Sequence, residues 1–101
     1  MTATLEELTL RVRARRDLPP PEVRRALRRA AGIPMRDVAE IVGVTRQAVA
    51  LWELGKREPR NKNLETYAEV LRTLRQEVTD LSLSKRESAP IKALPGKADD
   101  V

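Results

Sequence analysis

Residues 35–60 read MRDVAEIVGVTRQAVALWELGKREPR, and their small and apolar side chains fall where two short helices joined by a sharp turn need them. Gly43 suits a left-handed residue that ends the first helix, and Thr45 can cap the second. Ala39 is small enough for the second helix to pass close by. The apolar positions where the two helices would face each other are Val38, Val42, Val44, Val49 and Trp52. This pattern predicts a helix-turn-helix, whose second helix usually enters the major groove of DNA.

The composition bounds the class of protein. A chain of 101 residues has room for one small domain with tails. It contains no cysteine and no histidine, which excludes disulfides, thiolate chemistry and histidine-based metal sites, and no cofactor is expected. There is no apolar run of about 18 residues and no signal-peptide pattern at the N-terminus, so we expect a protein of the cytoplasm or nucleoid with no membrane partner.

Charge is distributed unevenly along the chain. Residues 1–60 hold 13 Lys or Arg against 8 Asp or Glu, whereas residues 61–101 hold 7 of each. The whole excess of positive charge therefore lies in the part that contains the motif. A basic surface attracts the phosphate backbone and releases counterions, although an arginine-rich solvated surface would show the same composition.

The remaining sequence predicts an all-α fold: a compact bundle of about five helices with a long C-terminal helix and a flexible tail. An N-terminal helix occupies 1–18, the helix-turn-helix domain 19–81 and the tail 82–101. The first helix runs from about 5 to 16, because Thr4 and Glu7 form a capping box and the prolines at 19–21 break the chain. The other helices are expected at about 20–31, 34–42, 46–54 and 64–81.

Apolar spacing predicts which faces of these helices point inward. Leu5, Leu8 and Val12 share one face of the first helix. In the second helix the inward positions are Val23, Leu27 and Ala30, and the rest of its surface is covered by Arg24, Arg25, Arg28 and Arg29.

The last helix carries a seven-residue apolar repeat at Leu64, Tyr67, Leu71, Leu74, Val78 and Leu81. Its first three members close the core of the domain. Leu74, Val78 and Leu81 are either a continuation of that core or contacts with a second copy in a homodimer, an arrangement that suits palindromic DNA sites.

The helix at 46–54 has an outer face formed by Arg46, Gln47, Ala50, Leu51 and Leu54. Arg46 could read guanine and Gln47 adenine, while Ala50 and Leu51 could contact thymine methyl groups. Ala48 would lie close to the DNA backbone. Each position has a plainer explanation: Arg46 could touch only phosphate, Gln47 could simply favour a helix, and Leu51 and Leu54 could be covered by the chain itself.

The segment GVTRQAVALWELGKREP resembles the Cro/repressor-type helix-turn-helix regulators of the Xre family, and the resemblance spans about 23–75. It implies a buried ion pair between Arg28 and Glu53 that pins the recognition helix. It also implies base contacts from the first turn of that helix. The residues that match this first turn are Arg46, Gln47 and Ala48, and Lys56, Arg57 and Arg60 fall in a loop that commonly touches phosphate. Thr45 is also expected to contact the DNA backbone. The family usually opens the preceding helix with a polar cap and a phosphate-contacting glutamine, which are Pro34 and Met35 here, so Arg36 could substitute.

The leading hypothesis is a sequence-specific transcriptional regulator of double-stranded DNA, such as a small phage repressor or a Cro-like protein, that blocks a promoter by occupying its operator. The alternative is a DNA-binding antitoxin that neutralises a toxin through its C-terminal region. An excisionase-like binder would need a β-hairpin that the sequence lacks, and a pure protein-interaction module is a weaker possibility. We expect neither an enzyme nor a small-molecule ligand, because the chain has no catalytic histidine or cysteine and no glycine-rich phosphate loop.

Overall fold

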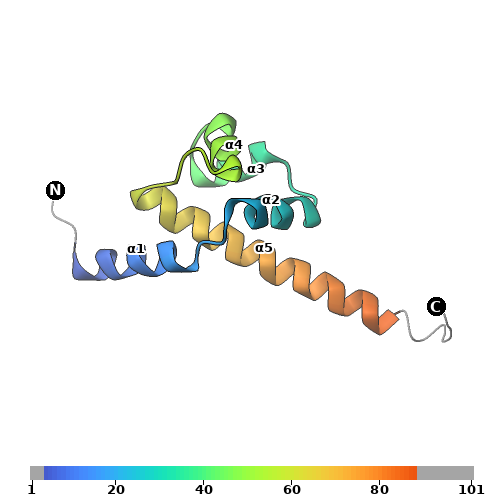
Figure 1. The fold of residues 1–101 in the computed structure, drawn as a ribbon. Coiled ribbons are helices and arrows are strands. Elements are labelled where there is room, and N and C mark those ends of the chain that lie inside the picture. The colour runs from blue at the N-terminus through green and yellow to red at the C-terminus, as the bar shows by residue number, and fades with distance from the viewer. Residues whose placement is uncertain (1–3, 89–101) are drawn as a thin grey trace.

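The computed structural model describes residues 4–88, and it describes side chains as far as residue 81. Five helices follow in order: α1 (Leu5–Asp17), α2 (Pro21–Ala30), α3 (Met35–Val42), α4 (Arg46–Leu54) and α5 (Asn61–Ser88). The described part contains no strand, so the all-α prediction is confirmed there. In Figure 1, α1 lies along one side of the first half of α5, and α2, α3 and α4 gather on the other side. The second half of α5 extends past the other helices.

The start of α1 is fixed by the predicted capping box. The Glu7 backbone N–H donates to Thr4 Oγ1 at 3.0 Å, and the Thr4 backbone N–H donates to Glu7 Oε1 at 3.1 Å. Glu6 and Glu7 in the first turn and Arg15 and Arg16 in the last turn complement the helix dipole. Local chemistry therefore favours this helix before it packs on anything.

The face of α1 that contacts α5 is different from the apolar face seen in the sequence. Ala14 is buried in a small cluster with Leu64 and Ala68 of α5, and Arg11 Nε lies 3.0 Å from Glu65 Oε2. The predicted apolar positions are exposed, with Leu5 at 82%, Leu8 at 53% and Val12 at 60%. A small alanine lets two helices approach closely, so α1 packs through Ala14 and leaves its larger aliphatic side chains in solvent.

The interior of α2 also departs from the prediction at two positions. Leu27 packs against the main core as expected, but Ala30 is exposed and Ala31, one residue later, packs there instead. Arg24, expected on the outer surface, is buried with only 4% of its surface exposed. Charged side chains are almost never fully buried unless they are paired, and Arg24 has acceptors in three other segments of the chain.

The main core lies between α5 and the helix-turn-helix. It contains Val38, Ala39, Val49, Trp52, Tyr67, Leu71 and Leu74, all buried. Val42 and Val44 pack against it from the side, as the sequence predicted. The rings of Trp52 and Tyr67 meet with centroids 4.7 Å apart and planes tilted by 46°, a favourable arrangement for two aromatic side chains.

The helix predicted at about 64–81 was too short at both ends. Helix α5 begins at Asn61, which has a positive φ of 54°, and it continues to Ser88. The residues after 81 include Leu, Lys, Arg and Glu, which favour helix even where no apolar stripe requires one. Residues 82–88 of the predicted tail are therefore helical, and 89–101 lie outside the described residues.

Tyr67 carries a buried hydroxyl for which the described part of the chain offers no hydrogen-bond partner. Burial raises the pKa of this hydroxyl well above its usual value, and the nearby carboxylate of Glu53 raises it further. The unfolded chain would ionise its tyrosine near pH 10, whereas the folded chain resists ionisation. The contribution of Tyr67 to the unfolding free energy is therefore constant below about pH 10 and falls above it.

Tyr67→Phe tests this directly, because Tyr67 is the only tyrosine. We expect the unfolding free energy of the natural protein to fall by up to about 1.4 kcal/mol per pH unit above pH 10, beyond any loss shared with the variant. At pH 7 the variant should be as stable as the natural protein or slightly more stable, because no hydrogen bond is lost. Urea unfolding between pH 8 and 11.5 measures both effects. Parallel pH profiles for the two proteins would contradict the assignment.

Candidate nucleic-acid interface

The turn between α3 and α4 has the geometry that its sequence predicted. Gly43 ends α3 in the left-handed region with φ of 85°. The backbone N–H groups of Gly43 and Val44 both donate to the Ala39 carbonyl, at 2.8 and 2.9 Å. Ala39 itself is 4% exposed, so its methyl group occupies the place where the two helices approach each other. A left-handed glycine and a small residue together set the angle between α3 and α4.

One face of helix α4 is buried against the core, and the opposite face is exposed to solvent. Thr45 caps it by accepting the Ala48 backbone N–H at 3.1 Å, while Val49 and Trp52 anchor it with 0% and 3% exposure. Arg46 and Gln47 are exposed on its first turn, where side chains of a recognition helix reach base edges. Two exposed polar side chains therefore stand on a helix whose opposite face is buried in the core.

The apolar side chains of α4 outside the core differ in their exposure. Ala50 and Leu51 are half-buried, so each presents only part of its side chain. Leu54 is 58% exposed and is not covered by any described part of the chain. Ala48 is half-buried and packs against the main core, which turns its methyl group away from the outer face.

The ion pair implied by the resemblance is present. Arg28 Nη2 lies 3.0 Å from Glu53 Oε1, and Arg28 Nε donates to Glu53 Oε2 at 2.5 Å. The third donor, Arg28 Nη1, reaches the Ile33 carbonyl at 2.9 Å. The side chains are 11% and 5% exposed. The hydrogen bond to Glu53 raises the pKa of Arg28, although burial acts in the opposite direction. This two-point contact joins α2 to the last turn of α4.

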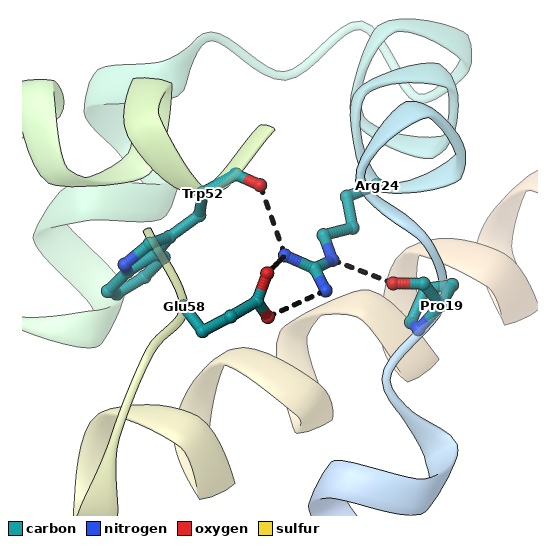
Figure 2. Close-up of polar contacts among 4 residues, drawn as sticks. All are labelled: Pro19, Arg24, Trp52 and Glu58. Carbon is teal, nitrogen blue, oxygen red and sulfur yellow. Dashed lines mark hydrogen bonds and ion pairs between the residues drawn. The ribbon is translucent and has the colours of Figure 1, made fainter. Parts of the chain in front are cut away.

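A second buried arginine was missed by the sequence analysis. Arg24 lies one turn before Arg28 on α2 and forms its own two-point contact, with Glu58 in the loop after α4 (Figure 2). Its nearest approach is 2.9 Å, from Nη2 to Glu58 Oε1. Arginines four residues apart share a helix face, and the glutamates at 53 and 58 repeat at similar spacing. This repeated spacing of arginines and glutamates was the feature of the sequence that could have indicated a second ion pair.

The loop between α4 and α5 begins at Gly55 and folds back on α4. Gly55 has φ of 74°, and an added Cβ there would lie 3.1 Å from Pro21 Cγ. The Lys56 backbone N–H donates to the Leu51 carbonyl at 3.0 Å, and Pro59 is fully buried. The cationic side chains of Lys56, Arg57 and Arg60 are exposed. The loop therefore has a fixed backbone and a basic outer surface.

The remaining predicted contact with the DNA backbone is Arg36, which lies outside α4. Arg36 is 82% exposed near the start of α3, with its Nε 3.9 Å from Asp37 Oδ1. A shallow hollow lies between it and Arg46, and this hollow also has Asp37 and Glu40 in its lining. Arg36 is thus free to reach outward, but in a locally balanced electrostatic setting rather than a purely basic one.

The three predicted dimer contacts on α5 are not equivalent. Leu74 is 9% exposed and belongs to the core of its own chain, which removes it from a surface available to a second copy. Val78 is half-buried, and Leu81 is 55% exposed. The apolar repeat changes from core to surface between Leu74 and Leu81, because α5 continues beyond the helices that cover its first half (Figure 1).

No group of three or more His, Cys, Asp or Glu side chains is arranged to hold a metal ion within the described part. No helix of that part is long and apolar enough to cross a membrane.

Three features place this fold in the helix-turn-helix class of DNA-binding proteins. They are a turn with a left-handed glycine, a capped second helix with an exposed first turn, and a basic loop after that helix. A family model described as Helix-turn-helix (HTH_3) matches residues 25–78, more than half of the chain. The chain belongs to this family, whose members are Xre-type DNA-binding transcription regulators. Neither the comparison with curated proteins nor the comparison with solved structures found a match.

Proposed function

We propose that the protein is a sequence-specific repressor that occupies an operator in double-stranded DNA and so blocks a promoter. The observation that carries this proposal is the exposure of Arg46 and Gln47 on a helix whose opposite face is completely buried. Arg46 pairs with guanine and Gln47 with adenine, since these side chains match the donor and acceptor patterns of those bases. Ala50 and Leu51 contribute the exposed parts of their side chains to thymine methyl groups.

Contacts with the DNA backbone surround these readers. Arg36 and Thr45 flank the start of α4, and Lys56, Arg57 and Arg60 lie beyond its end. Ala48 lies on the same turn, but it packs against the main core and donates its backbone N–H to Thr45, so it offers no polar group to a phosphate. Each neutralised phosphate releases counterions, so affinity should fall steeply with salt.

A homodimer supplies the specificity that two polar readers lack. We assign its contacts to Val78 and Leu81, the half-buried and exposed members of the apolar repeat on α5. A two-fold dimer reads a palindromic site with one recognition helix per half-site. The protein would then act in the cytoplasm or nucleoid of a bacterial host, as a phage immunity repressor or a Cro-like regulator would.

The exposed end of α5 also supports a second candidate, an antitoxin that uses the same surface to bind a toxin. The two differ in solution. A repressor should form dimers and bind its operator alone, whereas an antitoxin should bind a co-encoded partner protein with defined stoichiometry. Light scattering on the purified chain, alone and co-expressed with its neighbouring gene product, separates the two.

Selection from a random pool of DNA duplexes tests the proposed function most directly. We expect a palindromic motif with half-sites about one helical turn, 34–36 Å, apart. Enrichment of a single unrepeated half-site would contradict the dimer, and recovery of no motif would contradict sequence-specific binding.

Gln47→Ala should weaken binding to the selected site by about 1–3 kcal/mol per half-site and relax base choice at one position. Arg57→Ala is the matched control, because it removes an exposed loop cation without touching a reader. It should weaken binding equally on all duplexes and reduce the salt slope by about one unit. Fluorescence anisotropy on matched and substituted duplexes measures both effects. If Gln47→Ala loses affinity equally on every duplex, Gln47 is not a base reader.

A further inference from the structure

Arg24 joins three segments of the chain through one guanidinium group (Figure 2). Its Nε donates to the Pro19 carbonyl at 2.7 Å, its Nη1 donates to the Trp52 carbonyl at 3.0 Å, and its Nη2 donates to Glu58 Oε1 at 2.9 Å. The Arg24 side chain is only 5% exposed. Every nitrogen of this buried cation therefore has an acceptor, which is what makes its burial tolerable.

The three acceptors belong to parts of the molecule with different tasks. The Trp52 carbonyl lies in the last turn of α4, where a cation also compensates the negative end of the helix. Glu58 belongs to the basic loop, between Arg57 and the buried Pro59. Pro19 belongs to the connection from α1 to α2. The recognition helix and the loop behind it are thus held to the same side chain.

We propose that Arg24 is a positioning residue for DNA binding, which fixes the basic loop at a set distance from the recognition helix. DNA presents base edges and phosphates at fixed distances from each other. A protein that contacts both therefore needs a fixed distance between its base-reading side chains and its phosphate-contacting loop. Arg24 fixes that distance by binding both the end of α4 and Glu58. This inference rests on the proposed DNA-binding function.

Arg24 also controls charge in the loop. Glu58 is 44% exposed and would place a carboxylate beside the cations of Lys56, Arg57 and Arg60 if it were free to swing outward. Its two oxygens instead face the Arg24 guanidinium, at 2.9 and 3.4 Å. The loop therefore presents cations to an approaching phosphate, with its single carboxylate turned inward and neutralised.

Arg28 provides a matched comparison within the same helix. It is also a buried arginine in a two-point contact with a glutamate, but its acceptors, Glu53 and the Ile33 carbonyl, do not belong to the loop. Disrupting Arg28 should reduce stability without changing the arrangement of the loop. Disrupting the Arg24–Glu58 contact should change the loop even in molecules that remain folded.

The experiment uses the full chain with Glu58→Gln and Arg24→Lys, and it has two measurements. The first, without DNA, is amide hydrogen exchange, in which we expect residues 56 and 57 to exchange about tenfold faster while core amides of α4 keep their protection. The second is the salt dependence of binding to duplex DNA for Arg24→Lys, which keeps the Glu58 carboxylate in the loop, and there we expect the slope to fall by about one to two units. Base preference at the positions read by Gln47 should persist.

Arg28→Lys and the exposed Arg25→Lys are the controls. Arg28→Lys should lower the melting temperature and leave the salt slope of the folded protein unchanged, and Arg25→Lys should leave loop exchange unchanged. The inference is overturned if Glu58→Gln exchanges its loop amides as slowly as the natural protein, or if the slope of Arg24→Lys equals that of the natural protein. Failure of the natural protein to bind any duplex would instead refute the proposed function, since the exchange measurement decides the role of Arg24 in the loop without DNA.

Discussion

Replacing Glu53 with alanine is expected to lower the unfolding free energy by about 3–5 kcal/mol, a large part of the total stability of a small domain. The physical reason is the charge left behind. Arg28 has a side chain that is 11% exposed, and two of its nitrogens would lose their acceptor at once. The Ile33 carbonyl would remain as a partner, but it carries no full charge to offset the guanidinium. Urea unfolding followed by circular dichroism measures the change.

The control for Glu53→Ala removes both charges. A double variant with Arg28→Met and Glu53→Leu should lose less stability than Glu53→Ala alone, because an apolar pair of similar volume leaves no buried charge unpaired. This comparison separates the cost of an orphaned charge from the loss of packing. Glu53→Ala within about 1 kcal/mol of the natural protein would mean that water reaches Arg28 and that the pair does not pin α4.

The turn and the caps could be predicted from sequence because their chemistry is local. Gly43 adopts the left-handed conformation that its position between two apolar patterns indicated, and Thr45 caps α4 through a residue three positions away. The buried face of α4 follows from spacing alone, since Val49 and Trp52 lie three residues apart on one side of the helix. The exposed positions of Arg46 and Gln47 follow from the same geometry.

Features that depend on distant partners could not be predicted in this way. An apolar stripe shows which side chains share a face but not whether another helix covers it, so Leu5, Leu8 and Val12 of α1 remain exposed. Arg24 was assigned to the surface because arginine usually lies there, and its burial depends on acceptors that include the Trp52 carbonyl and Glu58, 28 and 34 residues away.

The apolar repeat of α5 shows the same limit in one helix. Leu74 and Leu81 occupy equivalent positions seven residues apart, and nothing in their spacing distinguishes them. The difference arises because α5 extends past the body formed by α2, α3 and α4 (Figure 1), and Leu74 is buried whereas Leu81 is exposed. Leu74 thus closes the core of one chain, whereas Leu81 is available to another molecule.

Leu74→Ala and Leu81→Ala should therefore have opposite effects on two measurements. Leu74→Ala opens a cavity in the core and should lower the unfolding free energy by about 2–5 kcal/mol. Leu81→Ala removes a side chain that is 55% exposed and should change the stability of a single chain by less than about 0.5 kcal/mol. If Leu81 contacts a second copy, the same change should weaken the dimer about tenfold, an effect of about 1.4 kcal/mol.

Sedimentation equilibrium over a range of concentrations measures the dimer, and urea unfolding at low concentration measures the single chain. A natural protein that stays monomeric at all concentrations would refute the proposed dimer while leaving the cost of Leu74→Ala unchanged. A loss of stability for Leu81→Ala equal to that for Leu74→Ala would mean that the end of α5 is covered by its own chain. The pair of substitutions thus distinguishes a core that ends near Leu74 from an apolar surface that begins beyond it.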